Sequence, residues 1–478
     1  MRKQQIAFAA LLALFSPLLG SAQEKWDLKQ CVEYALSNNL SVQQQDVQAR
    51  LEQLTLEQSR LARYPSLHFT NNTGLNTGRS IDRTTNQFTT QSIFYSGFSL
   101  QSSVEVFNFH RQQHTIAANR FAAEAATATV DKVRNDVALN VAGAYLQILL
   151  NHQQVEISQV QVQQTAAQLS NTRKQVEAGS VPELNAAQLE AQLAQDSATL
   201  ITTQGAETQS LLYLKALLSM DAGQPFAIAT PPVALIPLEP LASLQPEAVY
   251  QQALANLPQQ RANRLRLLAA QRSVAAARGA MYPSLSLGAN LQTNYSTARN
   301  QALALEPLTR TDTIGKVSGS NAPVLTTVRV PQYTYYADPF GTQFSNNFGN
   351  GVGLSLSVPI FNGGAARTGW QRAKLNVRTY ELQQQQENLT LKQDIYKAYT
   401  DAVTSLQKFT ATTKGAEAAQ KAFEFATKRY DIGLLNSLDL IISQSNLYRA
   451  RQERLLAQFD YVFKMKVLEF YKGQGIRL

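Results

Sequence analysis

The sequence predicts an exported membrane protein of the mixed α+β class, in which long helical hairpins follow a small number of β-strands. Three observations support this prediction: an apolar N-terminal export signal, a unit that occurs twice along the chain, and apolar side chains spaced seven residues apart over long proline-free segments. The strands themselves alternate apolar and small polar residues, a pattern typical of strands in membrane barrels.

The composition limits the classes of function. Of 478 residues, 16% are charged and 44% are hydrophobic, and the formal net charge is +9. No run of five or six Lys and Arg residues occurs, so we expect no nucleic-acid partner. The single cysteine, Cys31, excludes an intramolecular disulfide, and four histidines leave little material for a metal site. We therefore expect no cofactor and no metal.

Residues 1–22 are expected to form a secretory signal peptide. Arg2 and Lys3 precede an apolar run from Ile6 to Leu19, and Gly20-Ser21-Ala22 supplies small residues before a cleavage site. This run is too short to span ~30 Å of hydrocarbon, and no later stretch approaches eighteen apolar residues. Cys31 has two possible roles, as a lipid-attachment site or as a small buried side chain. We favour the small buried side chain.

One unit of structure occurs twice. Tyr64-Pro65-Ser66-Leu67 recurs as Tyr282-Pro283-Ser284-Leu285, at an offset of 218, whereas Gly179 recurs as Gly433, at an offset of 254. The larger offset means that 36 residues are inserted in the second copy. This comparison divides the chain after the signal peptide into repeat 1 (23–220), a proline-rich extended linker (221–245) and repeat 2 (246–478).

Each repeat is expected to end in a long helical hairpin, at 110–219 and 365–472. A seven-residue apolar period predicts a left-handed coiled coil. The turns are expected at Gly179-Ser180-Val181-Pro182 and Gly433-Leu434-Leu435-Asn436. Shorter helices are expected near 42–62 and 259–280. The apolar positions are Val141, Ile148, Val155, Val162, Leu169 and Val176 in repeat 1, and Ile395, Ala402, Phe409, Ala416, Phe423 and Tyr430 in repeat 2.

Two strands are expected before each long helix, at about 66–75, 92–107, 284–297 and 350–361. Apolar residues such as Leu100 and Leu354 alternate there with small polar residues such as Ser99 and Ser355. Glu105 falls on the polar face and is expected to line a lumen. The alternative is the half-buried sheet of a soluble protein.

Four strands cannot close a barrel, and an open sheet edge in hydrocarbon leaves backbone groups unpaired. Copies of the chain must therefore associate if the strands enter a membrane. Two copies would give eight strands with a filled interior, and three would give twelve strands around a lumen; the Ser, Gln and Gly residues of the polar face favour a lumen. The long segment 298–349 is expected to be an outer loop, with a partly ordered plug or cap as the alternative.

The order of elements resembles the TolC-like outer membrane efflux proteins. The matching motifs are Tyr-Pro-Ser-Leu at the first strand of each half, Val358-Pro359-Ile360-Phe361-Asn362-Gly363-Gly364 before the second long helix, and Arg429-Tyr430-Asp431-Ile432-Gly433 with Ser437-Leu438-Asp439 at the second hairpin. The resemblance implies a homotrimer in the lipid of the bacterial outer membrane. Its twelve-stranded β-barrel would continue into a periplasmic α-barrel.

The resemblance also implies a function. Such a trimer would be the passive outer-membrane duct of a tripartite efflux or type I secretion system, conducting small molecules or exported polypeptides. Its partners would be a periplasmic adaptor protein and an inner-membrane pump. The hairpin tips, Gly179, Ser180, Val181, Gly433 and Leu434, resemble the adaptor-docking sites.

The family's periplasmic aperture carries an acidic ring and a latch between the two hairpins. By resemblance, Asp439 matches the first acid, Tyr430 the latch tyrosine, and Asn185 the position of an aspartate in the first repeat. Leu435 replaces the latch arginine and Ile442 replaces a second acid, which implies a mouth gated by packing and one carboxylate per subunit. For Tyr430 a structural role in the coiled-coil seam remains open, as does simple stabilisation of a helix start by Asp439.

Two other classes of function were compared with the channel. An enzyme is not expected, because His110 and His114 lack the glutamate of a zinc-hydrolase helix and no phosphate-binding glycine loop follows a strand. An exported coiled-coil structural protein or adhesin without transport activity is the remaining alternative. It would need the seven-residue spacing but not four matched amphipathic strands.

Overall fold

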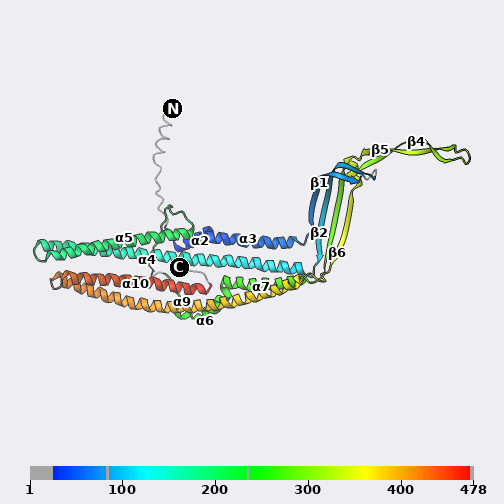
Figure 1. Ribbon diagram of the computed structural model, residues 1–478. Coiled ribbons are helices and arrows are strands. Elements are labelled where there is room, and N and C mark those ends of the chain that lie inside the picture. Colours follow the sequence, from blue (N-terminus) through cyan, green and yellow to red (C-terminus); the bar gives the residue numbers. More distant parts are fainter. Residues whose placement is uncertain (1–24, 82–85, 234–235, 474–478) are drawn as a thin grey trace, which may run out of the picture. The chain divides into compact units, whose positions relative to one another are not determined.

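The computed structural model describes residues 25–81, 86–233 and 236–473 (Figure 1). The signal peptide predicted at 1–22 lies outside these residues. The described chain divides into two compact units. The first takes in the residues up to Thr55, Ala118–Gln271 and the residues from Leu375 onwards, and the second takes in Leu56–Ala117 and Arg272–Lys374. Each unit is described separately below.

Helices of unusual length dominate the chain. The helices α4 (Arg111–Glu177) and α9 (Ala365–Asp431) have 67 residues each, which corresponds to a length of about 100 Å at about 1.5 Å per residue. Each is followed by a shorter antiparallel helix, α5 (Glu183–Leu218) or α10 (Ser437–Tyr471) (Figure 1). None of the helices in the described residues is long and apolar enough to cross a membrane.

Two short helices stand before the strands in each repeat: α2 (Leu28–Asn38) and α3 (Leu40–Leu61), then α6 (Pro246–Asn256) and α7 (Pro258–Gly279). Asn39 separates the first pair, because its backbone is extended and its Oδ1 accepts a hydrogen bond from the Ser41 N–H (2.9 Å). The linker between the repeats contains a short 3-10 helix, η3 (Leu241–Ser243). The linker also contacts the start of the chain, where Trp26 N–H donates to the Ala227 carbonyl (3.0 Å).

The second unit contains an antiparallel sheet in the order β1-β2-β3-β6, so that β1 and β6 are its edges. Its strands are β1 (Ser66–Ile81), β2 (Phe88–Phe107), β3 (Ser284–Ser296) and β6 (Gly349–Ser357). The register aligns the apolar residues, since Phe69 lies opposite Leu100 and Leu100 lies opposite Leu291. Residues directly opposite one another share a face. One face is therefore apolar and exposed.

The other face of this sheet is polar. His68 lies opposite Gln101, Gln101 opposite Asn290, and Asn290 opposite Gly351. On the apolar face, by contrast, Phe69 is 67% exposed and Val352 is 79% exposed. Such exposure of large apolar groups marks a surface that is covered by lipid or by another chain.

The strand limits differ from the sequence-based expectation at two places. Strand β1 runs on to Ile81 and β2 begins at Phe88, so the first hairpin is longer than expected, although residues 82–85 of its turn lie outside the described part. Strand β6 ends at Ser357 rather than near 361. Pro359 follows, and its ring nitrogen has no hydrogen to donate to a neighbouring strand.

The segment 298–349 was expected to be a loop, and this expectation is wrong. It contains a two-stranded antiparallel hairpin, β4 (Asn300–Lys316) and β5 (Pro323–Ala337), and a short helix, α8 (Phe340–Asn346). In the described residues this hairpin forms a separate sheet from the four-stranded one. The helix α8 packs against β3, where the Thr293 hydroxyl donates to the Phe344 carbonyl (2.7 Å).

The largest apolar cluster of the first unit lies where α2, α4, α5 and α10 meet. Val141 and Ile148, two residues of the predicted seven-residue series, are buried there beside Cys31 and Tyr145. Burial, and to a lesser degree the charge of Asp27, raises the pKa of the Cys31 thiol to about 12. A buried, protonated thiol is chemically inert, which agrees with the interpretation of Cys31 as a small core residue.

Candidate functional site

The two helical hairpins turn through the same backbone motif. Gly179 (φ 70°) and Gly433 (φ 75°) adopt the left-handed conformation that only glycine enters without strain. Gly179 N–H donates to the Val176 carbonyl and Ser180 N–H to the Gln175 carbonyl (both 2.9 Å). The matching bonds at Gly433 and Leu434 are 2.9 Å and 2.8 Å. These bonds satisfy carbonyl groups at the helix end, so each tip is a closed, rigid turn.

Tyr430 joins the two hairpins. Its hydroxyl lies 2.9 Å from the hydroxyl of Thr172, a fully buried residue of α4. Tyr430 itself is half-buried and occupies the seven-residue apolar series of α9. The side chain therefore packs in the seam and forms a hydrogen bond across it, whereas its role as a latch stays a prediction.

The structure does not bring the other predicted aperture residues into contact with Tyr430. Asp439 is exposed in the first turn of α10, where its backbone N–H donates to Asn436 Oδ1 (2.8 Å) and Asn436 caps the helix. Asn185 is half-buried in the first turn of α5. In the part of the chain that the structure describes, neither side chain forms a hydrogen bond or ion pair with another predicted aperture residue.

A row of buried polar residues was missed in the sequence. Ser158, Thr165 and Thr172, spaced seven residues apart on α4, are at most 1% exposed. The hydroxyl of Ser158 lies 2.9 Å from that of Tyr448 on α10, and Gln444 Nε2 donates to the Thr165 hydroxyl (2.9 Å). We term these contacts, together with the hydrogen bond between Tyr430 and Thr172, the polar seam. The seven-residue spacing of these three residues is visible in the sequence, but it does not distinguish buried side chains from solvated ones.

The polar seam reaches α5 through Asp196. This carboxylate is 8% exposed and accepts hydrogen bonds from the hydroxyl of Thr165 (2.6 Å) and from Gln192 Nε2 (2.8 Å). Ser437 adds a further contact between the hairpins, because its hydroxyl donates to Gln188 Oε1 (2.7 Å). The two hairpins of one chain are thus joined by hydrogen bonds that all lie in the first unit.

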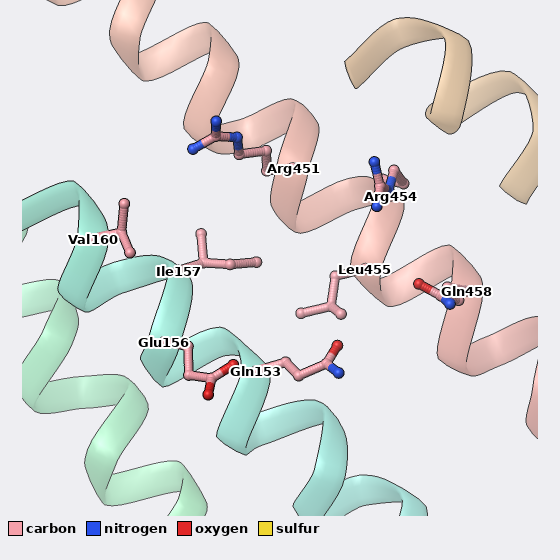
Figure 2. Close-up of a pocket in the computed structure, with 8 residues that line it drawn as sticks. All are labelled: Gln153, Glu156, Ile157, Val160, Arg451, Arg454, Leu455 and Gln458. Carbon is pink, nitrogen blue, oxygen red and sulfur yellow. The ribbon is translucent and has the colours of Figure 1, made fainter. Parts of the chain in front are cut away.

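Beyond the polar seam, α4 and α10 separate around a groove of about 340 Å³ (Figure 2). Figure 2 shows Ile157 and Leu455 pointing into the space between the helices, with Arg451 and Arg454 on the α10 side. Arg451 also donates to Gln420 Oε1 (2.6 Å) of α9. Burial, and then the neighbouring charge of Arg454, lowers the pKa of the Arg451 guanidinium.

Glu105 lies on the polar face of the sheet, opposite Ser286. Its carboxylate accepts hydrogen bonds from Arg111 Nη2 (2.7 Å) and Asn108 Nδ2 (2.9 Å), so its charge is partly balanced at the start of α4. The predicted role of Glu105 in a lumen stays a prediction.

No group of three potential metal ligands of the His, Cys, Asp or Glu type occurs among the described residues.

The family model of the outer membrane efflux proteins matches residues 31–219 and 249–468. These ranges cover most of both repeats. The chain therefore belongs to the outer membrane efflux protein family.

Relatives and solved structures agree with this assignment. Outer membrane protein TolC of Escherichia coli (strain K12) is 27% identical over 124 residues, 26% of this chain and 25% of TolC. The alkaline protease secretion protein AprF of Pseudomonas aeruginosa is 30% identical over 124 residues, again 26% of this chain and 25% of the relative. Each alignment spans about a quarter of the relative. The structure of CusC is similar over 95% of this chain and 93% of its own, with a TM-score of 0.75 and 17% identity.

As a member of this family, the chain is a protein of the bacterial outer membrane, with its helical part in the periplasm. The predicted location is confirmed. The family consists of channel proteins rather than enzymes. The resemblance seen in the two repeats is confirmed as well.

The carboxylate of Asp196 is expected to stabilise the first unit. Asp196→Ala removes the acceptor for the buried Thr165 hydroxyl, and an unsatisfied buried polar group costs about 1–3 kcal/mol. Thermal unfolding of the purified protein should therefore shift to a clearly lower midpoint. Glu417→Ala, which removes an exposed carboxylate of α9, is the control. Equal shifts for the two variants would contradict the role of the polar seam.

Proposed function

We propose that three copies of the chain form a twelve-stranded barrel in the outer membrane, which continues into a helical barrel in the periplasm. The observation that supports this most strongly is the sheet β1-β2-β3-β6, which has one exposed apolar face and two unpaired edges. In hydrocarbon each unpaired backbone group costs several kcal/mol, so the edges need partners. Identical neighbouring chains can supply them.

The number of copies follows from the polar face. Eight strands would leave an interior only wide enough for side chains, whereas twelve leave a lumen. The row from His68 through Gln101 and Asn290 to Gly351 is polar and suited to contact with water. A hydrated lumen therefore supports three copies rather than two.

The proposed trimer is a passive duct in a tripartite efflux or type I secretion system. Family membership supports a periplasmic adaptor and an inner-membrane pump as its partners. AprF is named as a secretion protein for a protease, which supports exported polypeptides as one cargo class. Small molecules are the other proposed class of cargo. The tips at Gly179, Ser180, Val181, Gly433 and Leu434 are the proposed docking sites for the adaptor.

We place the gate of the duct at the ends of the hairpins. The polar seam, including the bond from Tyr430 to Thr172, would hold the second hairpin against the first in the closed state. Asp439, exposed beside the second tip, would contribute one carboxylate per subunit to the aperture, and Asn185 would stand near the first tip. Opening would break bonds in the seam without unfolding either hairpin.

The barrel can be tested with a matched pair of substitutions in β6. Leu356 shares the apolar face with Leu285, and Ser355 lies on the polar face. Leu356→Arg should hamper membrane assembly, because an arginine on the lipid-facing side of a strand is destabilising, by up to about 2–4 kcal/mol at the midplane and by less near the interfaces. Ser355→Arg should be tolerated. For both variants, assembly is measured as the yield of heat-modifiable trimer in outer-membrane fractions. Equal yields for Leu356→Arg and Ser355→Arg would show that the two faces of the sheet are assigned wrongly.

The aperture can be tested by single-channel recording in planar bilayers. Asp439→Ala removes one carboxylate per subunit, so block by multivalent cations should weaken and conductance should change. Glu417→Ala, which removes an exposed carboxylate 14 residues before the end of α9, should leave both the cation block and the conductance unchanged. Identical recordings for the wild type and Asp439→Ala would remove Asp439 from the aperture.

Docking can be tested at the second tip. Gly433→Trp adds bulk to the turn, whereas Gly433→Ala adds the same backbone strain at positive φ with little bulk. We expect Gly433→Trp to abolish export or drug resistance while the trimer persists, and Gly433→Ala to retain transport. Normal transport by Gly433→Trp would rule out the tip as the docking site.

A further inference from the structure

Cations gather where the strands join the helices. Arg60 and Arg63 lie at the end of α3, Arg278 at the end of α7, and Arg367, Arg372 and Lys374 in the first turns of α9. All six belong to the second unit and all six are exposed. We term these six residues the basic collar.

Ion pairs within the described residues do not balance the charge of the basic collar. In the described residues, none of its six side chains forms an ion pair with a carboxylate. Glu57 is the only acidic residue in segments 56–63, 272–283 and 358–374. Arg111 shows the contrast, since it stands at the same junction and is paired with Glu105 (2.7 Å). Exposed cations without a carboxylate partner favour an anionic ligand.

Two members of the basic collar are related by the internal repeat. Arg60 and Arg278 differ by the offset of 218, and each precedes a tyrosine by four residues, Tyr64 or Tyr282. Arg278 Nη2 donates to the hydroxyl of Tyr282 (3.4 Å), whose ring stacks on Phe109 with centroids 3.9 Å apart. The spacing of arginine and tyrosine therefore occurs in both repeats, at the same place before the first strand.

A second aromatic contact occurs at α9. Lys374 Nζ lies 3.4 Å from the centre of the Trp370 ring. Tyrosine and tryptophan are enriched at the level of lipid headgroups, with Lys and Arg beside them. The basic collar thus has the residue types of a membrane interface.

The basic collar also lies at the right depth for headgroups. The apolar face of the sheet begins at Leu67 and Leu285 and ends at Leu356, close in sequence to Arg63, Arg278 and Arg367. A bilayer of about 40–45 Å has a hydrocarbon core of about 30 Å, so a headgroup layer several ångströms thick adjoins the end of the apolar face at Leu67, Leu285 and Leu356. Long arginine side chains reach this layer from the helix ends.

We propose that the basic collar binds the phosphate groups of anionic phospholipids in the periplasmic leaflet of the outer membrane. This inference rests on the proposed function, because it requires the strands to lie in that membrane. The guanidinium group matches phosphate in geometry, with two parallel N–H donors. Bound lipid would fix the depth of the barrel and the angle at which the helices leave the membrane.

The test measures lipid retained by the purified trimer. Wild-type protein is incubated with phosphatidylglycerol and phosphatidylethanolamine in equal amounts in detergent, and bound lipid is counted by native mass spectrometry. We expect several-fold more phosphatidylglycerol than phosphatidylethanolamine on the wild type. The triple variant Arg60→Gln, Arg278→Gln and Arg367→Gln should lose this preference at least about five-fold, since each cation contributes to attraction by an anionic surface.

A charge-matched control removes three exposed lysines further along α9: Lys397→Gln, Lys414→Gln and Lys421→Gln. It should keep the lipid preference of the wild type. Equal retention of the two lipids by wild-type trimer, equal losses in the two triple variants, or retention of lipopolysaccharide alone would each overturn the proposal. A protein that never enters the membrane fraction would instead contradict the proposed function, so the two failures are distinguishable.

Discussion

The two unpaired edges of the sheet constrain everything else that we propose for this protein. Strands β1 and β6 each have a partner on one side only, while the face that includes Phe69 and Val352 is apolar and exposed. Water can form hydrogen bonds with the backbone groups of such edges, but exposure of such an apolar face to water is unfavourable. Lipid can cover the apolar face, but it leaves the backbone groups of the edges without hydrogen bonds. Pairing between copies resolves both conflicts at once. The lumen and the three-fold assembly that we propose rest on this pairing and on the polar face of the sheet.

The helical part answers a different requirement. The gate that we propose needs helices that pack firmly near the apolar core and separate more readily near their ends. Val141 and Ile148 supply the firm end through apolar contact. Toward the tips, the buried polar residues Ser158, Thr165 and Thr172 bond to the second hairpin, beside a smaller apolar cluster that includes Leu169 and Leu189. Hydrogen bonds can be exchanged for bonds to water at a small net cost, so this seam suits a reversible opening.

The sequence was sufficient where a simple period controls the structure. A seven-residue spacing of apolar side chains indicated helices such as α4, and a two-residue alternation indicated which residues share a face of the sheet. The hairpin β4–β5 escaped prediction, because its alternation is interrupted by register shifts near Leu305 and Thr313. The polar seam escaped for another reason: a buried serine or threonine on a helix has the same sequence signature as a solvated one. Only its partners across the hairpins reveal it.

The mass of the assembly extracted from outer membranes tests the central claim most directly. Multi-angle light scattering in mild detergent, corrected for bound detergent, gives the number of chains, each of 52.7 kDa before any processing. Our account predicts three chains per particle. It also predicts cross-links between a cysteine placed on β1 of one copy and a cysteine placed on β6 of its neighbour. A stable particle of a single chain, dispersed without detergent, would contradict it.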